Sequence, residues 1–478
     1  MLFNSFSYAV FLPVVFILYW LLANRSFRVQ NVLLLAASYF FYGCWDWRFL
    51  FLLAFSTLLD YFTGLKIFNA SNSLQRKAWL VISVVVNLGF LFCFKYYNFF
   101  ADSFAVMMHE VGMKVHYSTL NVILPVGISF YTFHGLSYVF DIYNRKISPT
   151  RNIVDYTLFV SFFPLLVAGP IERATHLLPQ VEKPRVFDYR NAVDGLRQIL
   201  WGLFKKVVIA DSCAEYVNLI FDHSTDYSGS TLLMGAFLFS FQIYGDFSGY
   251  SDIALGTARL FGFELLQNFK YPYFSRDIAE FWRRWHVSLS SWFRDYLYVP
   301  LGGSKGGMWM RIRNTFIIFL ISGFWHGANW TFIVWGALNA LFFIPLLVTE
   351  RNRTNLDIVA MNSSFPKWKE LLSILLTFGL TMLAWIFFRA KSVSHAINYL
   401  TDIFTPALFH LPEVRPFVTI IWILIFILIE WSGRHHQYAL HDFGTGKHKI
   451  VRWGFYYMLV IAIFYFSGKE QQFIYFQF

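Results

Sequence analysis

Apolar segments with almost no charge follow one another along most of the chain, separated by short polar stretches. They cover residues 8–23, 31–44, 49–68, 79–100, 121–142, 153–169, 195–221, 230–246, 313–325, 329–348, 370–389, 416–432 and 451–467. Because an apolar helix needs about 20 residues to cross a bilayer, these segments predict spanning helices, and the shorter ones predict tilted or re-entrant helices. The pattern therefore predicts an all-α, polytopic membrane protein in which residues 1–478 form one domain, since no polar stretch is long enough for a soluble domain.

Composition and charge agree with a membrane protein. The 478 residues are 57% hydrophobic and 14% charged, whereas soluble domains are about 25% charged. The net charge of +11 is scattered through short loops, so we expect no nucleic-acid partner. Loops 24–30, 66–77 and 143–151 are rich in Arg and Lys, which predicts that they are cytoplasmic and that the N-terminus is extracytoplasmic.

The stretch SGFWHGANW, residues 322–330, lies inside a run from Thr315 to Val348 that holds no charged residue. As one helix this run would be about 51 Å long at 1.5 Å per residue, which is more than a bilayer core of ~30 Å. We expect a break at Gly323 and Gly327, which places His326 at a turn beside a buried cavity. A neutral imidazole there suits a general base. The alternative is a structural histidine that a neighbouring carbonyl satisfies.

The stretch EFWRRWHVSLSSWFRDYLYVPLGGS, residues 280–304, has apolar residues at alternating steps of three and four. This spacing predicts one amphipathic helix at the membrane interface. Its polar side carries Arg284 and Asp295, and Glu280 and Arg284 form a favourable i, i+4 pair. His286 falls beside the apolar side, so we expect it to face the interior and to need a polar partner. The alternative is a histidine that reaches the interface.

Two further stretches place carboxylates in apolar surroundings. In GDFSGYSDIALG, residues 245–256, we interpret residues 246–249 as a helix break, with Ser248 or Ser251 capping the next helix. Asp246 and its neighbour Asp252 would hold arginines, orient imidazoles or form structural ion pairs. In GPIERATH, residues 169–176, Gly-Pro ends a span and Glu172 lies in an interfacial loop. No Walker A, GxSxG, CxxC or HExxH motif occurs, and we expect no metal site.

Three motifs together resemble the membrane-bound O-acyltransferase family. They are DFSGYSDIALG, YPYFSRDIAEFWRRWHVSLSSWFRDYLYVPLGG and GFWHGANWTFIVWGALNA. Within the family the chain is most similar to the bacterial branch of alginate O-acetylation. The core motifs fall in residues 121–345, and the C-terminal helices in residues 370–467 match more loosely. The resemblance implies a ring of about 11–13 transmembrane or re-entrant helices, with interfacial helices, around a central funnel that opens to both sides.

The resemblance also implies an activity. An acyl group, which we expect to be acetyl, moves from a cytoplasmic thioester donor to hydroxyls of an extracytoplasmic polysaccharide. The donor would be acetyl-CoA or an acyl-carrier protein acting as co-substrate, with no bound cofactor. A further partner would be an extracytoplasmic, esterase-like (SGNH-type) acetyltransferase that completes the transfer. The protein would lie in the bacterial cytoplasmic (inner) membrane.

The resemblance maps two family histidines onto this chain, His326 as the base and His286 as the second catalytic histidine. Candidates for binding or orienting the substrates are Glu172, Asp246, Ser248, Arg284, Asp295, Trp325 and Asn329. Transfer of D-alanyl or another acyl group to a cell-wall polymer is an alternative. A proton-coupled transporter or flippase is another, although it predicts repeated halves that the sequence lacks. A structural scaffold predicts that both histidines are dispensable.

Overall fold

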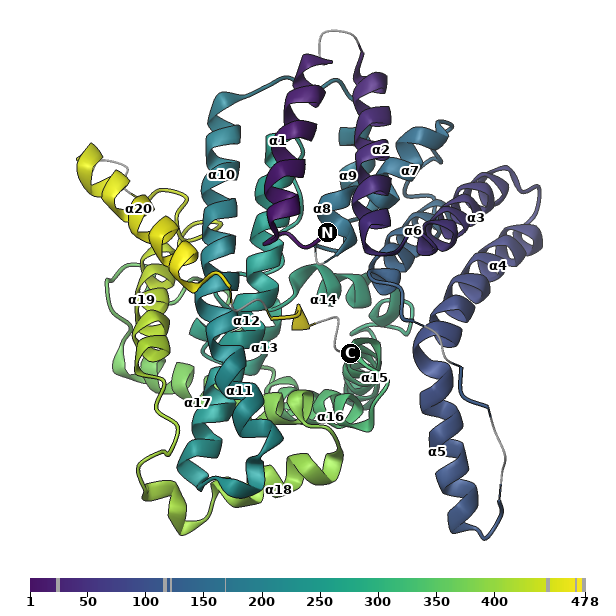
Figure 1. Cartoon of the computed structure of the whole chain (residues 1–478). Helices are drawn as coiled ribbons and strands as arrows, with labels where there is room; N and C mark the ends of the chain where they lie inside the picture. The colour runs from purple at the N-terminus through teal and green to yellow at the C-terminus, as the bar shows by residue number, and fades with distance from the viewer. Residues whose placement is uncertain are drawn as a thin grey trace. The chain divides into compact units, whose positions relative to one another are not determined.

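The computed structural model describes residues 1–22, 26–114, 118–120, 123–167, 169–443, 448–468 and 471–474, and its regular elements in these ranges are all helices (Figure 1). The all-α prediction is confirmed. The chain divides into two compact units. The first unit comprises Met1–Ala192 and Thr257–Leu266, and the second comprises Val193–Gly256 and Gln267–Phe478. That residues 1–478 form one domain stays a prediction.

The first unit is a set of packed helices. Its members are α1 (Phe6–Leu21), α2 (Phe27–Asp46), α3 (Phe49–Asn69), α4 (Ser73–Leu91), α5 (Tyr97–Glu110), α6 (Ile128–Tyr143), α7 (Ile153–Ser161), α8 (Phe163–Leu166) and α9 (Ala174–Val181). Helix α3 packs on α4 and α6, and α2 packs on α7. Between α3 and α4, the buried carboxylate of Asp60 accepts hydrogen bonds from Ser83 (2.6 Å) and Asn87 (2.8 Å). Two side chains of α4 thus satisfy the buried carboxylate of α3.

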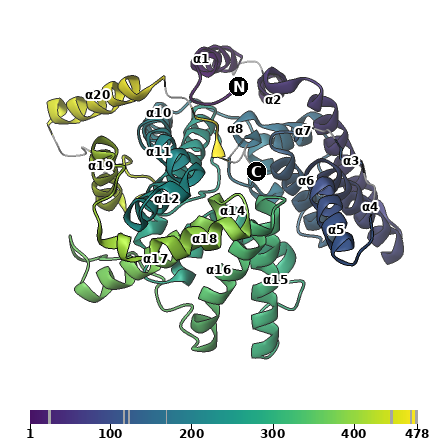
Figure 2. The same ribbon diagram turned by 60° about the horizontal axis from the view of Figure 1, so that its bottom comes forward.

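The second unit contains α11 (Asp211–Asp222), α13 (Ile278–Arg284), α14 (Val287–Phe293), α15 (Met308–His326), α16 (Trp330–Val348), α17 (Trp368–Arg389), α18 (Val393–Ile403), α19 (Phe417–Gly433) and α20 (Lys449–Phe466). Helices α10 (Tyr189–Leu203) and α12 (Gly229–Leu260) contribute residues to both units. Helices α15 and α16 lie side by side as a hairpin, with α17 against α16 (Figure 2). A Cβ on Gly323 or Gly336 would meet a backbone carbonyl of the other helix, so these glycines permit the close packing.

Five helical segments among the described residues are long and apolar enough to cross a membrane. They are α3, the continuous helix Ser73–Glu110, α16, α17 and α20. Helices α1 and α19 are apolar but shorter. The segments fit a polytopic membrane protein. The expected ring and its funnel stay predictions.

The predicted break in the uncharged run is confirmed. Helix α15 ends at His326, Gly327 follows in an extended conformation, and α16 begins at Trp330. The Asn329 side chain accepts a hydrogen bond from the Thr331 amide at 3.0 Å and so caps α16. The turn therefore lies at Gly327, whereas Gly323 remains inside α15.

Two other local predictions are wrong. Residues 280–304 do not form one helix, because α13 ends at Arg284 and His286 takes a left-handed conformation (φ 43°, ψ 52°) before α14. The backbone there pairs outside the helix, since the Lys270 amide donates to the Arg284 carbonyl and the Val287 amide to the Asn268 carbonyl, both at 2.9 Å.

The expected break and serine cap at residues 246–249 are also absent from the described chain, because α12 continues from Gly229 to Leu260. The Asp246 carboxylate, within this continuous helix, pairs with the Lys206 ammonium at 2.8 Å. Helix α5, which ends at Glu110, continues α4 through a π-helical turn, η1 (Phe92–Tyr96).

Candidate active site

His326 lies at the C-terminal end of α15 in an aromatic enclosure. Its side chain is 4% exposed. The imidazole ring centroid lies 4.9 Å from that of Trp325, 5.2 Å from that of Trp335 on α16 and 5.3 Å from that of Phe388 on α17. Three helices therefore hold the ring. The prediction that His326 is buried at the turn is confirmed, and the cavity expected beside it stays a prediction.

His286 lies in the bend between α13 and α14 and faces the same interior. It is 1% exposed, as predicted, and its ring centroid lies 6.5 Å from that of His326. Trp325 contacts both imidazoles, because its ring centroid is also 5.9 Å from that of His286. The left-handed bend separates α13 from α14 at His286, whose side chain lies beside Trp325 and His326. The bend therefore brings together two histidines that are far apart in the sequence.

Asn268 supplies the polar partner that a buried His286 requires. Its Oδ1 lies 3.3 Å from His286 Nδ1 and accepts a hydrogen bond from the Ser288 hydroxyl at 2.6 Å, while its Nδ2 donates to the Ser251 hydroxyl at 3.0 Å. With the amide in this orientation, Nδ1 of His286 carries the hydrogen and Nε2 keeps its lone pair. Within the described chain Nε2 has no hydrogen-bond partner, so it is available to a substrate or water.

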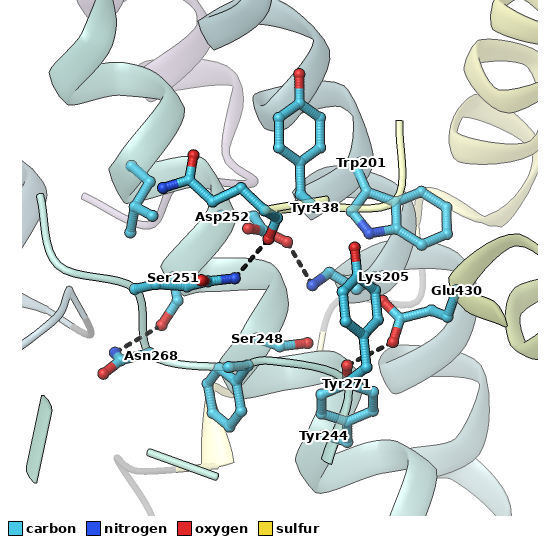
Figure 3. Close-up of a pocket in the computed structure, with 14 residues that line it drawn as sticks. Trp201, Lys205, Tyr244, Ser248, Ser251, Asp252, Asn268, Tyr271, Glu430 and Tyr438 are labelled. Carbon is cyan, nitrogen blue, oxygen red and sulfur yellow. Dashed lines mark hydrogen bonds and ion pairs between the residues drawn. The ribbon is translucent and has the colours of Figure 1, made fainter. Parts of the chain in front are cut away.

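Asn268 also lines a small polar cavity (Figure 3). Lys205 pairs with Asp252 across it, and Tyr244 donates to the Glu430 carboxylate at 2.5 Å. The hydroxyls of Ser248 and Tyr271 also line the cavity and have no partner among the described residues. Buried polar groups of this kind are commonly satisfied by water. The carboxylates predicted near residues 245–256 thus pair with lysines, and neither pairs with an arginine in the described chain.

The remaining candidates of the second unit lie in structural contacts. Arg284 donates to the Glu280 carboxylate at 2.7 Å, which confirms the predicted i, i+4 pair. Asp295 pairs with Arg294 at 2.8 Å and is 30% exposed. Asn329 caps α16. Their roles in binding or orientation stay predictions.

Glu172 belongs to the first unit and is fully buried there. Its carboxylate accepts from the Leu266 amide at 2.5 Å and contacts His176 Nδ1 at 2.8 Å. The hydrogen bond to Glu172 raises the pKa of His176. These contacts give Glu172 a structural role in its unit, and a part in catalysis stays a prediction.

Sequence reasoning missed Asn268, Lys205 and Glu430. Asn268 stands in a polar stretch, where a single amide carries no distinctive pattern. Lys205 and Glu430 are charged residues within apolar segments, and this is the one sequence signal that distinguishes them.

Comparison with known proteins defines the class of this protein. Residues 143–363 match the model of the membrane-bound O-acyltransferase family. A probable alginate O-acetylase of Pseudomonas aeruginosa is 39% identical over 408 residues, which cover 85% of this chain and 75% of that protein. The chain therefore belongs to the membrane-bound O-acyltransferase family, and it is a multi-pass membrane acyltransferase.

Other relatives place it more narrowly. A peptidoglycan O-acetyltransferase of Helicobacter pylori is 38% identical over 431 residues, which cover 84% of this chain and 79% of that protein. A teichoic acid D-alanyltransferase of Bacillus subtilis is 26% identical over 359 residues, which cover 72% and 89%. The identity of 39% to the alginate O-acetylase, against 26% to the teichoic acid D-alanyltransferase, confirms the predicted branch of alginate O-acetylation. Since the chain belongs to an acyltransferase family, the alternatives of a transporter and of a structural scaffold are set aside.

Proposed function

We propose that this protein transfers acetyl groups from a thioester donor to hydroxyls of an extracytoplasmic polysaccharide. The observation that carries the proposal is the pair of buried imidazoles, His286 and His326, with ring centroids 6.5 Å apart. The O-acetylating relatives support acetyl as the group and a polysaccharide as the acceptor.

In the proposed mechanism, His326 accepts the proton of the acceptor hydroxyl as its oxygen attacks the thioester carbonyl carbon. A C–O bond forms, the C–S bond breaks, and the proton passes from His326 to the leaving thiolate. Such proton transfer contributes about 10²–10⁴-fold. The partial negative charge at the end of α15 stabilises the imidazolium that forms in between.

His286 has a complementary role in this mechanism. It lies between two helices that are too short to span a membrane, and burial lowers the pKa of its imidazole to about 3. It is therefore neutral at pH 7, and Nε2 keeps a lone pair that accepts a hydrogen bond from a donor group of the substrate other than the reacting hydroxyl, or from water. Its partner Asn268 fixes the ring, so His286 holds the substrate in place while the hydroxyl proton passes to His326.

The donor, the partner and the orientation are further parts of the proposal. Acetyl-CoA or an acyl-carrier protein delivers the acetyl group on the cytoplasmic side of the bacterial inner membrane. An esterase-like (SGNH-type) transferase supplies the hydroxyl that accepts the acetyl group and then passes the group to a polysaccharide hydroxyl outside. The N-terminus lies on that outer side.

The test of the base is His326→Gln in cells that lack the native gene, measuring polysaccharide O-acetyl content and the amount of protein in the membrane. We expect O-acetylation to fall by at least about 100-fold at unchanged protein level. The exposed His410→Gln variant is the control and should retain full activity. Full O-acetylation by a stably inserted His326→Gln protein would refute the assignment.

The direction of transfer is tested in proteoliposomes. Acetyl-labelled donor is supplied on the side that corresponds to the cytoplasm, and the partner transferase and polysaccharide on the other. Label on the polysaccharide supports the proposal, and no label with active partner present contradicts it. A parallel reaction with a D-alanyl carrier tests the alternative that the Bacillus subtilis relative suggests.

A further inference from the structure

An apolar cavity of about 470 Å³ lies between α17, α19 and α12 in the second unit. Its volume is within the ~300–1,000 Å³ of ligand pockets. The lining is almost wholly aromatic and aliphatic and includes Phe237, Phe378 and Phe426. Leu375 on α17 and Leu428 on α19 also line it, yet they are 56% and 68% exposed. Because α17 and α19 are apolar enough for the bilayer, the cavity opens toward lipid.

A second, polar cavity adjoins it where α17 begins and α19 ends. This cavity has a volume of about 520 Å³ and is lined by Ser363, Ser364, Ser432, Arg434 and His435, among others. Trp431 lines both cavities. Tryptophan and basic residues are typical of the bilayer interface. An apolar and a polar cavity that share this residue suit the two parts of an amphiphile.

Arg434 gives the polar compartment its charge. It is 8% exposed, and its guanidinium donates to the carbonyls of Val359 (3.1 Å), Ala360 (3.0 Å), Ser363 (2.8 Å) and Trp431 (2.8 Å). These bonds use four of the five N–H groups and leave one on Nη1. No carboxylate lies within ion-pair distance of Arg434 in the part of the chain that the structure describes. A buried cation without an anion is costly, and a phosphate would compensate it.

The loop that contains Val359 and Ala360 is held so that its carbonyls accept hydrogen bonds from Arg434. Val359, Ala360 and Ile374 form a small buried cluster against which Trp431 packs, and the guanidinium lies 4.3 Å from the Trp431 ring centroid. Ala360 has φ +48°, a left-handed conformation that residues with a Cβ rarely adopt. Such strain persists only where the surroundings impose it, so the carbonyls around Arg434 are firmly placed.

We propose that the second unit binds an anionic glycerophospholipid of the membrane, with its phosphate beside Arg434 and an acyl chain in the apolar cavity. This site is separate from the histidine pair and does not rest on the proposed reaction. Arg276 and Arg284, two other arginines of the unit, each pair with the Glu280 carboxylate. Arg434 is therefore the one of these three that needs an external anion.

The test is lipid retention by the purified full-length protein, counted by native mass spectrometry. Delipidated protein is mixed with equal amounts of phosphatidylglycerol and diacylglycerol, which share acyl chains and differ in the phosphoglycerol head group. We expect at least about tenfold preference for phosphatidylglycerol, since a charge-assisted hydrogen bond is lost with the phosphate. Equal retention of the two lipids would overturn the proposal.

Variants separate the two compartments. Arg434→Gln should abolish the preference, whereas Arg434→Lys should keep part of it and reports on folding. Leu375→Trp, which fills the apolar cavity, should lower retention of both lipids. The exposed Arg415→Gln variant is the matched control and should behave as the parent. An unchanged preference in Arg434→Gln, or displacement of the lipid by millimolar inorganic phosphate alone, would show that the site is not a phospholipid site.

Discussion

Lys206 offers the sharpest test of how the second unit is held together. It lies in a π-helical turn, η2 (Phe204–Ala210), and its side chain is 1% exposed. Its ammonium pairs with the Asp211 carboxylate at 2.7 Å and with the Asp246 carboxylate at 2.8 Å. Lys206→Met leaves two buried carboxylates without their shared cation. We expect the free energy of unfolding to fall by about 3–5 kcal/mol, the usual cost of removing one partner of a buried pair.

Asp246→Asn should cost less, about 1.5–3 kcal/mol, for two reasons. Lys206 keeps Asp211, and the asparagine oxygen still accepts the hydrogen bond that the Ile474 amide donates at 2.7 Å. If the role of Asp246 is structural, the folded fraction of this variant retains acetyl transfer per molecule. Transfer that disappears in stably folded Asp246→Asn protein would instead support a role in orienting the reaction.

The assay is denaturation in mixed detergent micelles with increasing SDS, followed by far-ultraviolet circular dichroism. The matched control is Lys391→Met, because Lys391 pairs with Asp222 at 2.7 Å while the two side chains are 64% and 41% exposed. That variant should lose less than about 1 kcal/mol. Similar losses of unfolding free energy for Lys206→Met and Lys391→Met would refute the argument that burial sets the cost of removing an ion pair.

Three further predictions concern the histidine pair and the α15–α16 hairpin. Asn268→Leu should lower the turnover number in proteoliposomes by about tenfold, since it removes the acceptor for His286 Nδ1. Asn268→Asp should retain most of the turnover. Equal losses of turnover in the two variants would argue against a positioning role for Asn268. Gly323→Val should destabilise the hairpin by about 1–3 kcal/mol in the SDS titration, because its Cβ meets the Phe332 carbonyl. The control Gly307→Ala should be neutral, because its Cβ meets nothing within 4 Å. A neutral effect of Gly323→Val would contradict the close packing of α15 and α16. Because burial lowers the pKa of His286 to about 3 in the folded state, from about 6.5 unfolded, the unfolded chain binds the proton more tightly, and stability falls as pH falls from 6.5 toward 3. His286→Asn should weaken that fall between pH 7.5 and 5 in melting experiments, and an unchanged slope would show that other groups cause it.

Local features were predicted where local physics decides them. The uncharged run around His326 was too long for one helix, and the glycines indicated where it would break, so the turn between α15 and α16 at Gly327 followed from local signals. The Glu280–Arg284 pair followed from helical spacing, because a single turn brings the two side chains together. The motifs also identified the family.

Predictions failed where distant segments compete with local preference. The steps of three and four over residues 280–304 indicate a helix, yet the backbone at Arg284 and Val287 bonds to residues 268–270 and bends the chain at His286. The break expected at residues 246–249 did not form, because Asp246 pairs with Lys206 from another helix. In both cases a tertiary partner replaced the local interaction on which the prediction rested.

The sequence by itself determined that this is a helical membrane protein, that His326 lies at a buried turn, and that the chain carries the motifs of an acyltransferase. Apolar runs, glycines and charges act over a few residues, so their consequences are visible along the chain. Only the tertiary structure decided that His286 lies 6.5 Å from His326, that Asn268 holds it, and that Arg434 stands without a carboxylate among the described residues. Those relations join segments that are tens of residues apart, and burial in a shared interior, which no local pattern encodes, sets their energies.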